Sequence, residues 1–189
     1  MPEVRQHLQW RRQLDLLSRT GVGLPAMAPA LCALVRQIVG AQTCVLMWVD
    51  SAGMPVGVHH EHPNEATQAL FMNEYERLFS GDREINVSWA ARQRGQACGR
   101  LLNPPPAYFR SNTYNLLIRG DHYRHMLDLR IDVDGMARAV VALCRPPGKA
   151  FDEHDAVALN SLLPALQRAC LKNASALEQG GSEDCTGHL

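Results

Sequence analysis

The helix–hairpin–helix pattern of residues 107–171 constrains the fold of this chain more than any other feature. Residues 125–145 contain two strand-like runs separated by Asp134-Gly135, a dipeptide that favours a tight hairpin because both central turn positions need a positive φ. Residues 107–119 have the composition of a helix, and Asp152 is a favourable N-cap for a long closing helix. A hairpin between two helices indicates an antiparallel sheet packed against helices.

The two strands of this hairpin differ in their expected exposure. Leu127, Leu129 and Ile131 alternate with charged residues, which is the period-2 pattern of a half-exposed strand. Residues 139–144 are apolar at every position and predict a central strand covered on both faces. Pro164 removes a backbone donor from the closing helix, so we expect a kink there.

The N-terminal half predicts two helices followed by a second hairpin. Residues 4–19 carry one apolar stripe on a charged helix, and residues 26–39 are apolar over most of a helical circumference. The β-prone run 43–49 predicts a strand, with 56–62 as its hairpin partner. Another helix is expected to begin at Pro63, near the first turn where proline is tolerated.

The middle of the chain gives a weaker signal. Residues 85–89 fit either a short strand or the start of a helix, and the three consecutive prolines that end at Pro106 indicate a loop. In the segment 107–119, Phe109, Thr113, Leu116 and Leu117 are spaced as the inner stripe of a helix.

Length and composition predict one domain and restrict its environment. The chain has 189 residues and a formal net charge of zero, which gives no overall attraction to nucleic acid or to an anionic membrane. It lacks the apolar runs of a membrane span or secretory signal, so a cytoplasmic location is expected. Its six cysteines form no Cys-x-x-Cys pair and are expected to be free thiols, with Cys98 the most exposed. We expect a domain at 1–177 and a linker or disordered tail at 178–189.

Together these elements predict an α+β fold with a central antiparallel sheet flanked by helices, of the GAF/PAS class, with the N- and C-terminal helices packed together. Three segments resemble the GAF-like sensor domain of LuxR-type (helix-turn-helix) bacterial transcriptional regulators: Phe109-Arg-Ser-x-x-Tyr-Asn, the hairpin, and Phe151-x-x-x-Asp followed by Leu162-Leu-Pro-x-Leu. This resemblance implies signal sensing through a small molecule bound between one face of the sheet and the segments that cross it.

The chain departs from these regulators at its C-terminal end. The regulators continue into a helix-turn-helix of about 60 residues, whereas this chain ends at Leu189. We therefore expect a sensor domain that lacks its DNA-binding half, either cut from a longer protein or standing alone, with no direct nucleic-acid binding. The alternative is a ligand-free scaffold for dimerisation or protein interaction. A pocket of several hundred Å³ favours sensing, and an interior without cavities larger than a few waters favours the scaffold.

The candidate ligand-binding residues are aromatic and polar side chains of the crossover region. Ligand pockets are mostly apolar with a few fixed polar groups, although aromatic residues at helical spacing also occur as plain core. We predict that the ligand, whose identity the sequence does not disclose, contacts Trp89, Tyr108, Phe109, Tyr114, Asn115, His122 and His125.

The candidate dimer interface lies on the first and last helices. The resemblance implies a homodimer in which these helices pack into a bundle, and the same stripes fit equally well against the domain's own sheet. The predicted residues are Trp10, Leu14, Leu17, Leu159, Leu163, Leu166 and Cys170.

The sequence offers little catalytic or metal-binding chemistry. His60 and His62 share one side of a strand and, with Glu65, form a possible metal site, but no second pair has ligand spacing and a solvated strand end is the simpler interpretation. Nothing marks Cys98 as an activated thiol. No nucleophile elbow or phosphate-binding glycine loop is present. We expect no enzymatic activity, no metal and no cofactor.

Overall fold

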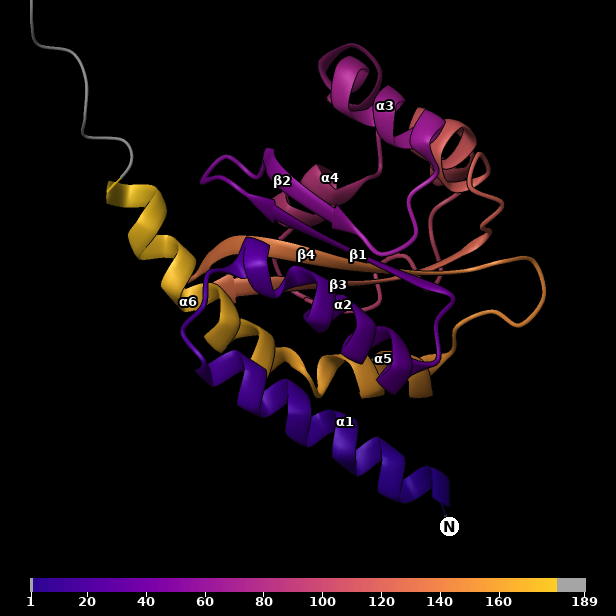
Figure 1. Ribbon diagram of the computed structural model, residues 1–189. Coiled ribbons are helices and arrows are strands. Elements are labelled where there is room, and N and C mark those ends of the chain that lie inside the picture. Colours follow the sequence, from indigo (N-terminus) through magenta and orange to yellow (C-terminus); the bar gives the residue numbers. More distant parts are fainter. Residues whose placement is uncertain (1, 180–189) are drawn as a thin grey trace, which may run out of the picture.

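The computed structural model describes residues 2–179, so most of the predicted tail at 178–189 lies outside the described residues. A four-stranded antiparallel sheet with the order β2-β1-β4-β3 forms the centre, with helices on both faces (Figure 1). The strands are β1 (Thr43–Val49), β2 (Pro55–His60), β3 (His125–Val133) and β4 (Met136–Arg145). The α-helices are α1 (Pro2–Arg19), α2 (Leu24–Val39), α3 (Glu65–Glu74), α4 (Val87–Arg92), α5 (Glu153–Asn160) and α6 (Leu163–Gln179).

The predicted α+β class and both hairpins are confirmed. Asp134 and Gly135 have φ values of +52° and +77°, as the tight turn between β3 and β4 requires. β4 lies between β1 and β3, and its residues from Ala139 onward are buried, which confirms the predicted central strand. Residues 85–89, whose sequence fits either a strand or a helix, contain the start of α4. The side chain of the N-cap residue Asn86 accepts a hydrogen bond from the backbone of Trp89.

The two faces of the sheet are covered by different sets of helices. One face packs its large apolar side chains, such as Leu46, Leu129 and Leu143, in a core shared with α2, α5 and α6, and α1 packs outside against α2 and α6. The predicted packing of the terminal helices is therefore confirmed. The opposite face lies under α3, α4 and the 101–123 segment, and Figure 1 shows α3 on the side of the sheet away from α1.

The predicted helix at 107–119 is wrong in its continuity and in its buried face. The segment is a 3-10 turn at Tyr108–Arg110 followed by a π-helix at Thr113–Ile118. Because a π-helix has a wider turn than 3.6 residues, the α-helical stripe does not apply, and Phe109 and Leu116 are 45% and 38% exposed.

The predicted half-exposure of β3 is also wrong. Asp128 and Arg130 are only 1% and 9% exposed, because residues 97–101 run along the free edge of this strand. The backbone of Arg130 donates to the carbonyl of Ala97 at 2.8 Å, and that of Gly99 donates to the carbonyl of Asp128 at 2.8 Å. These contacts, with one isolated bridge between Cys98 and Leu129, place residues 97–101 along the edge of β3 beside its charged residues.

The same segment corrects the prediction for Cys98. Its side chain is 7% exposed, and its thiol lies 3.4 Å from the carbonyl of Ala156. Burial raises the pKa of Cys98 to about 12, which disfavours the reactive thiolate. The five cysteines among the described residues are all free and buried, as expected of core thiols.

The closing helix is interrupted near Pro164. α5 ends at Asn160 and α6 begins at Leu163, so the proline occupies the first turn of a new helix where its missing N–H is harmless. No helix in the described part of the chain is long and apolar enough to cross a membrane.

Candidate ligand cavity

The candidate functional site is a cavity of about 120 Å³ on the face of the sheet opposite α1 and α2. Its floor comes from alternate residues of the two central strands: Val45 and Met47 of β1, and Val140, Ala142 and Cys144 of β4. This volume lies between the size expected for a packed scaffold and the size expected for a sensing pocket. It exceeds the roughly 30 Å³ of one water several-fold, but it is smaller than the roughly 300–1,000 Å³ typical of ligand pockets.

The cover of the cavity is held in place by polar contacts. Thr67 of α3 donates a hydrogen bond of 2.6 Å to the carboxylate of Asp121, which joins this helix to the loop before β3. The buried carboxylate of Glu84 accepts from the backbone of Asn112 and Thr113 at 2.9 Å and from the Thr113 hydroxyl at 2.8 Å. These bonds anchor the π-helix over the sheet and limit how far the cover can collapse into the cavity.

His60 brings an imidazole to the wall of the cavity from the end of β2. Its Nε2 is buried and has no hydrogen-bond partner among the described residues. Burial lowers the pKa of His60 below its usual value, although the nearby Asp121 carboxylate acts in the opposite direction. The neutral imidazole is therefore favoured at neutral pH, with one ring nitrogen available to a ligand.

Asp128 brings a carboxyl group to the cavity from β3. Its Oδ1 accepts a hydrogen bond of 2.7 Å from the backbone of Leu101, while Oδ2 is buried without a partner among the described residues. Burial raises the pKa of Asp128, and the Leu101 hydrogen bond partly offsets this effect. An acceptor in this position is costly to leave unpaired and has a strong preference for a donor.

None of the predicted ligand-binding residues lines the cavity. Tyr108 is 1% exposed, and its hydroxyl donates to the sulfur of Met126 at 2.7 Å. Tyr114 packs against Tyr108 with ring centroids 5.1 Å apart, whereas Phe109 lies 45% exposed beside them. Asn115 donates to the backbone carbonyls of Phe109 and Ser111, so it stabilises the turn and faces no ligand.

The remaining three of these residues are scattered. Trp89 lies in α4 and packs between two small apolar clusters, His122 is exposed with a φ of +62°, and His125 is half-buried at the start of β3. The structure therefore brings together the tyrosines and Phe109 as an aromatic cluster next to the cavity. The candidate cavity lies between the sheet and the crossover segment, and no pattern in the sequence indicated the strand and α3 residues that line it.

The predicted dimerisation residues belong largely to the core of the chain itself. Four of them are at most 1% exposed, and the other three are partly buried against the same cluster. The four buried residues are Leu14, Leu159, Leu166 and Cys170, and the partly buried ones are Trp10, Leu17 and Leu163. These residues therefore pack against the interior of their own domain, which is the alternative given in the sequence analysis. Homodimerisation stays a prediction.

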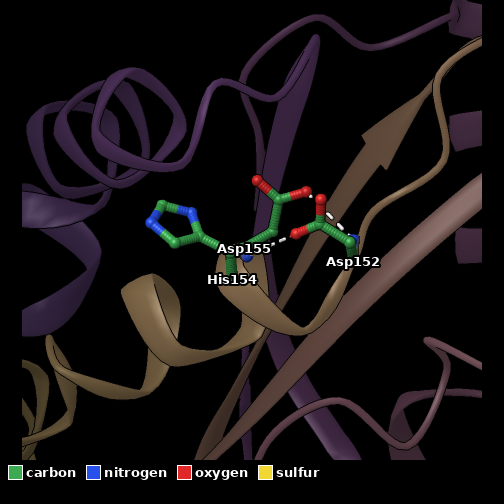
Figure 2. Close-up of side chains that lie close together, drawn as sticks. All are labelled: Asp152, His154 and Asp155. Atoms are coloured by element: carbon green, nitrogen blue, oxygen red, sulfur yellow. Dashed lines mark hydrogen bonds between the residues drawn. The ribbon is translucent and has the colours of Figure 1, made fainter.

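The histidine-rich end of β2 does not assemble a metal-ligand group. His60 faces the cavity and His62 is exposed beyond the strand. Across the described residues, the one group of three ligand-type side chains with closely spaced donor atoms is Asp152, His154 and Asp155, at the start of α5 (Figure 2).

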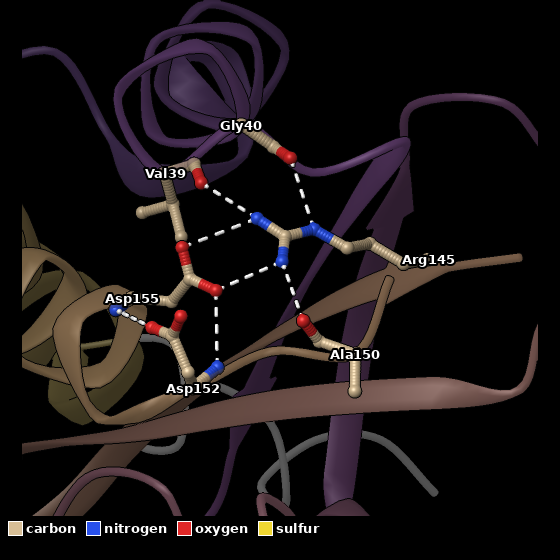
Figure 3. Close-up of polar contacts among 6 residues, drawn as sticks. All are labelled: Val39, Gly40, Arg145, Ala150, Asp152 and Asp155. Atoms are coloured by element: carbon tan, nitrogen blue, oxygen red, sulfur yellow. Dashed lines mark hydrogen bonds and ion pairs between the residues drawn. The ribbon is translucent and has the colours of Figure 1, made fainter. Parts of the chain in front are cut away.

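This group is accounted for by helix capping and an ion pair. Asp152 and Asp155 form a reciprocal capping box, each accepting from the other's backbone N–H at 3.0–3.1 Å. The two carboxylate oxygens of Asp155 also accept from Arg145 at 2.8 and 3.2 Å. Figure 3 shows that the same guanidinium reaches the carbonyls of Val39, Gly40 and Ala150, so the charge of Asp155 is already neutralised.

No protein-family model matches the sequence, and no curated protein matches it. Three solved structures share its fold at low identity. The GAF3 domain of Slr1393 from Synechocystis sp. PCC6803, in its photoproduct state, is 12% identical with a TM-score of 0.53, over 85% of this chain and 100% of that one. The GAF domain of a protein named as a sensor histidine kinase, from Pseudomonas syringae pv. tomato, is 16% identical with a TM-score of 0.50, over 97% and 94%.

The third structure is CepR2 from Burkholderia cenocepacia, an N-acylhomoserine lactone-dependent transcription factor of the LuxR family. It is 11% identical with a TM-score of 0.52, over 94% of this chain and 99% of that one. At these identities the similarity concerns the fold alone. The chain thus has a GAF-like α+β fold with its cavity on the outer face of the sheet.

Proposed function

We propose that this chain is a signal-sensing GAF-like regulatory domain that binds a small molecule in the cavity beneath α3, without catalysis. The observation that carries the proposal is the combination of a mainly apolar cavity with two buried polar atoms that lack partners among the described residues, His60 Nε2 and Asp128 Oδ2. Apolar walls with a few fixed polar groups are the usual chemistry of a ligand site. A packed scaffold has no reason to keep such atoms unpaired, because each costs stability.

We further propose that the domain serves a regulator of the LuxR type. The fold likeness to CepR2 supports this context, as do the sequence segments around Phe109 and Phe151. Ligand binding would act on the closing helices only through a difference in affinity between two arrangements of the domain. The connection available for this coupling is β4, which carries Cys144 in the cavity and Arg145 in the contact with α5.

The test is native mass spectrometry of the freshly purified chain beside its denatured mass. We expect a reproducible excess mass per subunit in the native spectrum, and its value would begin to identify the ligand. The matched variant is Ala142→Leu, which fills the cavity from its floor and should abolish the excess mass.

The control is Ala139→Leu on the same strand, whose side chain points into the packed core on the other face and is 0% exposed. We expect it to lose about 1–3 kcal/mol of unfolding free energy from overpacking. Ala142→Leu should lose little. Equal destabilisation by both substitutions, together with no excess native mass, would contradict a ligand cavity.

A second candidate function, a dimerisation scaffold, is favoured by a different observation. Val4, Leu8 and Leu16 are 65%, 54% and 67% exposed on α1, away from the stripe that packs inward. These residues are positioned to meet a second copy of the chain, and such an interface is compatible with ligand sensing.

A further inference from the structure

Two residues that line the cavity have polar atoms without partners among the described residues, and they lie at the two ends of one row of paired residues that crosses the four strands. His60 of β2 pairs with Val45 of β1, Val45 pairs with Ala142 of β4, and Ala142 pairs with Asp128 of β3. All four residues line the cavity. Because the row crosses three strand spacings, the Cα atoms of His60 and Asp128 lie about 14 Å apart. The floor is therefore apolar in its middle and polar at both edges.

The neighbouring rows lack this pattern. On one side the residues that line the cavity are Val58, Met47 and Val140, and on the other they are Cys144 and Met126. The polar ends thus define one direction across the cavity, perpendicular to the strands. A ligand that satisfies both ends must lie along this row.

The electrostatic surroundings favour a neutral ligand. Arg100 lies near Asp128, and its attraction lowers the pKa of this carboxyl against the larger opposing effect of burial. Arg100 itself donates to the carbonyls of Ala90 and Arg94, at 3.1 and 3.0 Å. Because Arg100 already supplies a positive charge near Asp128, a neutral donor can satisfy Asp128 Oδ2 without a second cation. At the other end, Asp121 and Thr67 are already bonded to each other, which leaves His60 Nε2 as the free group.

We propose that the ligand is a slender neutral molecule, apolar along its length, that donates a hydrogen bond to Asp128 at one end and bonds His60 Nε2 at the other. This inference rests on the proposed sensing function and deepens it by naming the class of ligand. A hydroxyl is the simplest probe of either end, because it both donates and accepts and therefore suits either tautomer of His60.

The experiment titrates the full chain with α,ω-diols from 1,4-butanediol to 1,8-octanediol and with the 1-alkanols of the same lengths, followed by amide chemical shifts in NMR. Hydrophobic burial alone makes the affinity rise steadily with chain length. Anchoring at both ends makes the preference for diol over alkanol pass through a maximum at the length that spans the row. We expect such a maximum, with a preference of about fivefold, which is the size of one net hydrogen bond.

The variants are His60→Phe, which keeps a ring but removes Nε2, and Asp128→Leu, which keeps a similar size but removes both carboxylate oxygens and leaves no hydrogen-bonding group for a hydroxyl. Each should reduce the preference at the optimal length to near unity. The controls are His59→Phe, the neighbouring residue of β2 that does not line the cavity, and Asp134→Asn in the exposed hairpin turn. Both controls should keep the wild-type preference.

The outcomes separate this inference from the proposed function. Two results contradict the proposal that the ligand is anchored at both ends of the row: saturable binding without a maximum in the preference for diol, and a preference for diol that is unchanged in both variants. Either result is still compatible with a sensing cavity. Absence of saturable shifts with every diol and alkanol also overturns it, whereas the native mass spectrum decides the proposed function independently.

Discussion

Asp128 carries a buried carboxyl group whose ionisation opposes folding. Its carboxyl is 1% exposed, and one of its oxygens has no partner among the described residues. Burial raises the pKa of Asp128 in the folded state above its ordinary value of 3.8. At pH values just above 3.8, the folded protein therefore keeps this proton more often than the unfolded chain does. This group therefore lowers the free energy of unfolding as the pH rises from about 4 toward neutrality.

We expect Asp128→Asn to be more stable than the wild type at pH 7 by about 1 kcal/mol, since it removes a buried charge with an unpaired oxygen. The gain should shrink as the pH falls toward 3.8, where the wild-type carboxyl becomes neutral. Urea unfolding at pH 7 and at pH 4 measures this difference. Asp134→Asn, in the exposed turn, serves as the control and should change little at either pH. A variant less stable than the wild type at pH 7 would argue that Asp128 has a structural partner.

At the scale of elements, Arg145 joins three parts of the fold. Its guanidinium pairs with Asp155 of α5, donates to the carbonyls of Val39 and Gly40 at the end of α2, and lies 4.0 Å from the ring centroid of Phe151. Arg145 and Asp155 are 9% and 8% exposed. The pair thus fixes the closing helix to the end of β4, next to the cavity residue Cys144.

We expect Arg145→Met to lose about 3–5 kcal/mol of unfolding free energy, because it leaves the buried Asp155 carboxylate without its cation. Arg145→Lys should also lose stability, since lysine lacks the planar fork that meets two carboxylate oxygens. The double variant Arg145→Met/Asp155→Leu should be less destabilised than the sum of its single substitutions, measured by chemical denaturation. Arg124→Met, at an exposed arginine before β3, is the control and should stay within about 0.5 kcal/mol of the wild type. Strict additivity in the cycle would show that the ion pair contributes nothing of its own.

At the scale of the whole molecule, the inward stripe of α1 packs within the chain itself, whereas its outer surface carries a few exposed apolar residues among charged ones. Leu14 is 1% exposed in the core, whereas Leu8 and Leu16 are 54% and 67% exposed. We expect a homodimer in which these exposed residues of α1 meet those of a second copy, because burying large apolar side chains is favourable.

Sedimentation velocity should therefore give twice the chain mass for the wild type and one chain mass for Leu8→Glu/Leu16→Glu. The thermal midpoint of the monomeric variant, measured at low protein concentration, should stay close to that of the wild type because neither position is buried in the chain. Gln13→Glu, which adds the same charge at another exposed position on α1, should remain dimeric. A wild type that sediments as a monomer at all accessible concentrations excludes this interface.

Local sequence patterns were sufficient for the hairpins and for the start of the closing helix. The Asp134-Gly135 turn, the apolar run of β4, and the capping residue Asp152 each depend on neighbours within a few positions, so their structures follow from the sequence alone. The α+β class and the two hairpins could be predicted for the same reason.

Only the tertiary structure decided which residues form the site. β3 alternates as a solvent-facing strand does, yet residues 97–101 bury Asp128 along its edge. The π-helix at Thr113–Ile118 displaced the predicted stripe, because its wider turn is set by contacts such as Glu84 with Thr113. His60 and Asp128 are 68 positions apart, and only the register of four strands places them in one row. Long-range pairing leaves no periodic trace in a sequence, and for that reason the cavity and its polar ends had to be read from the fold.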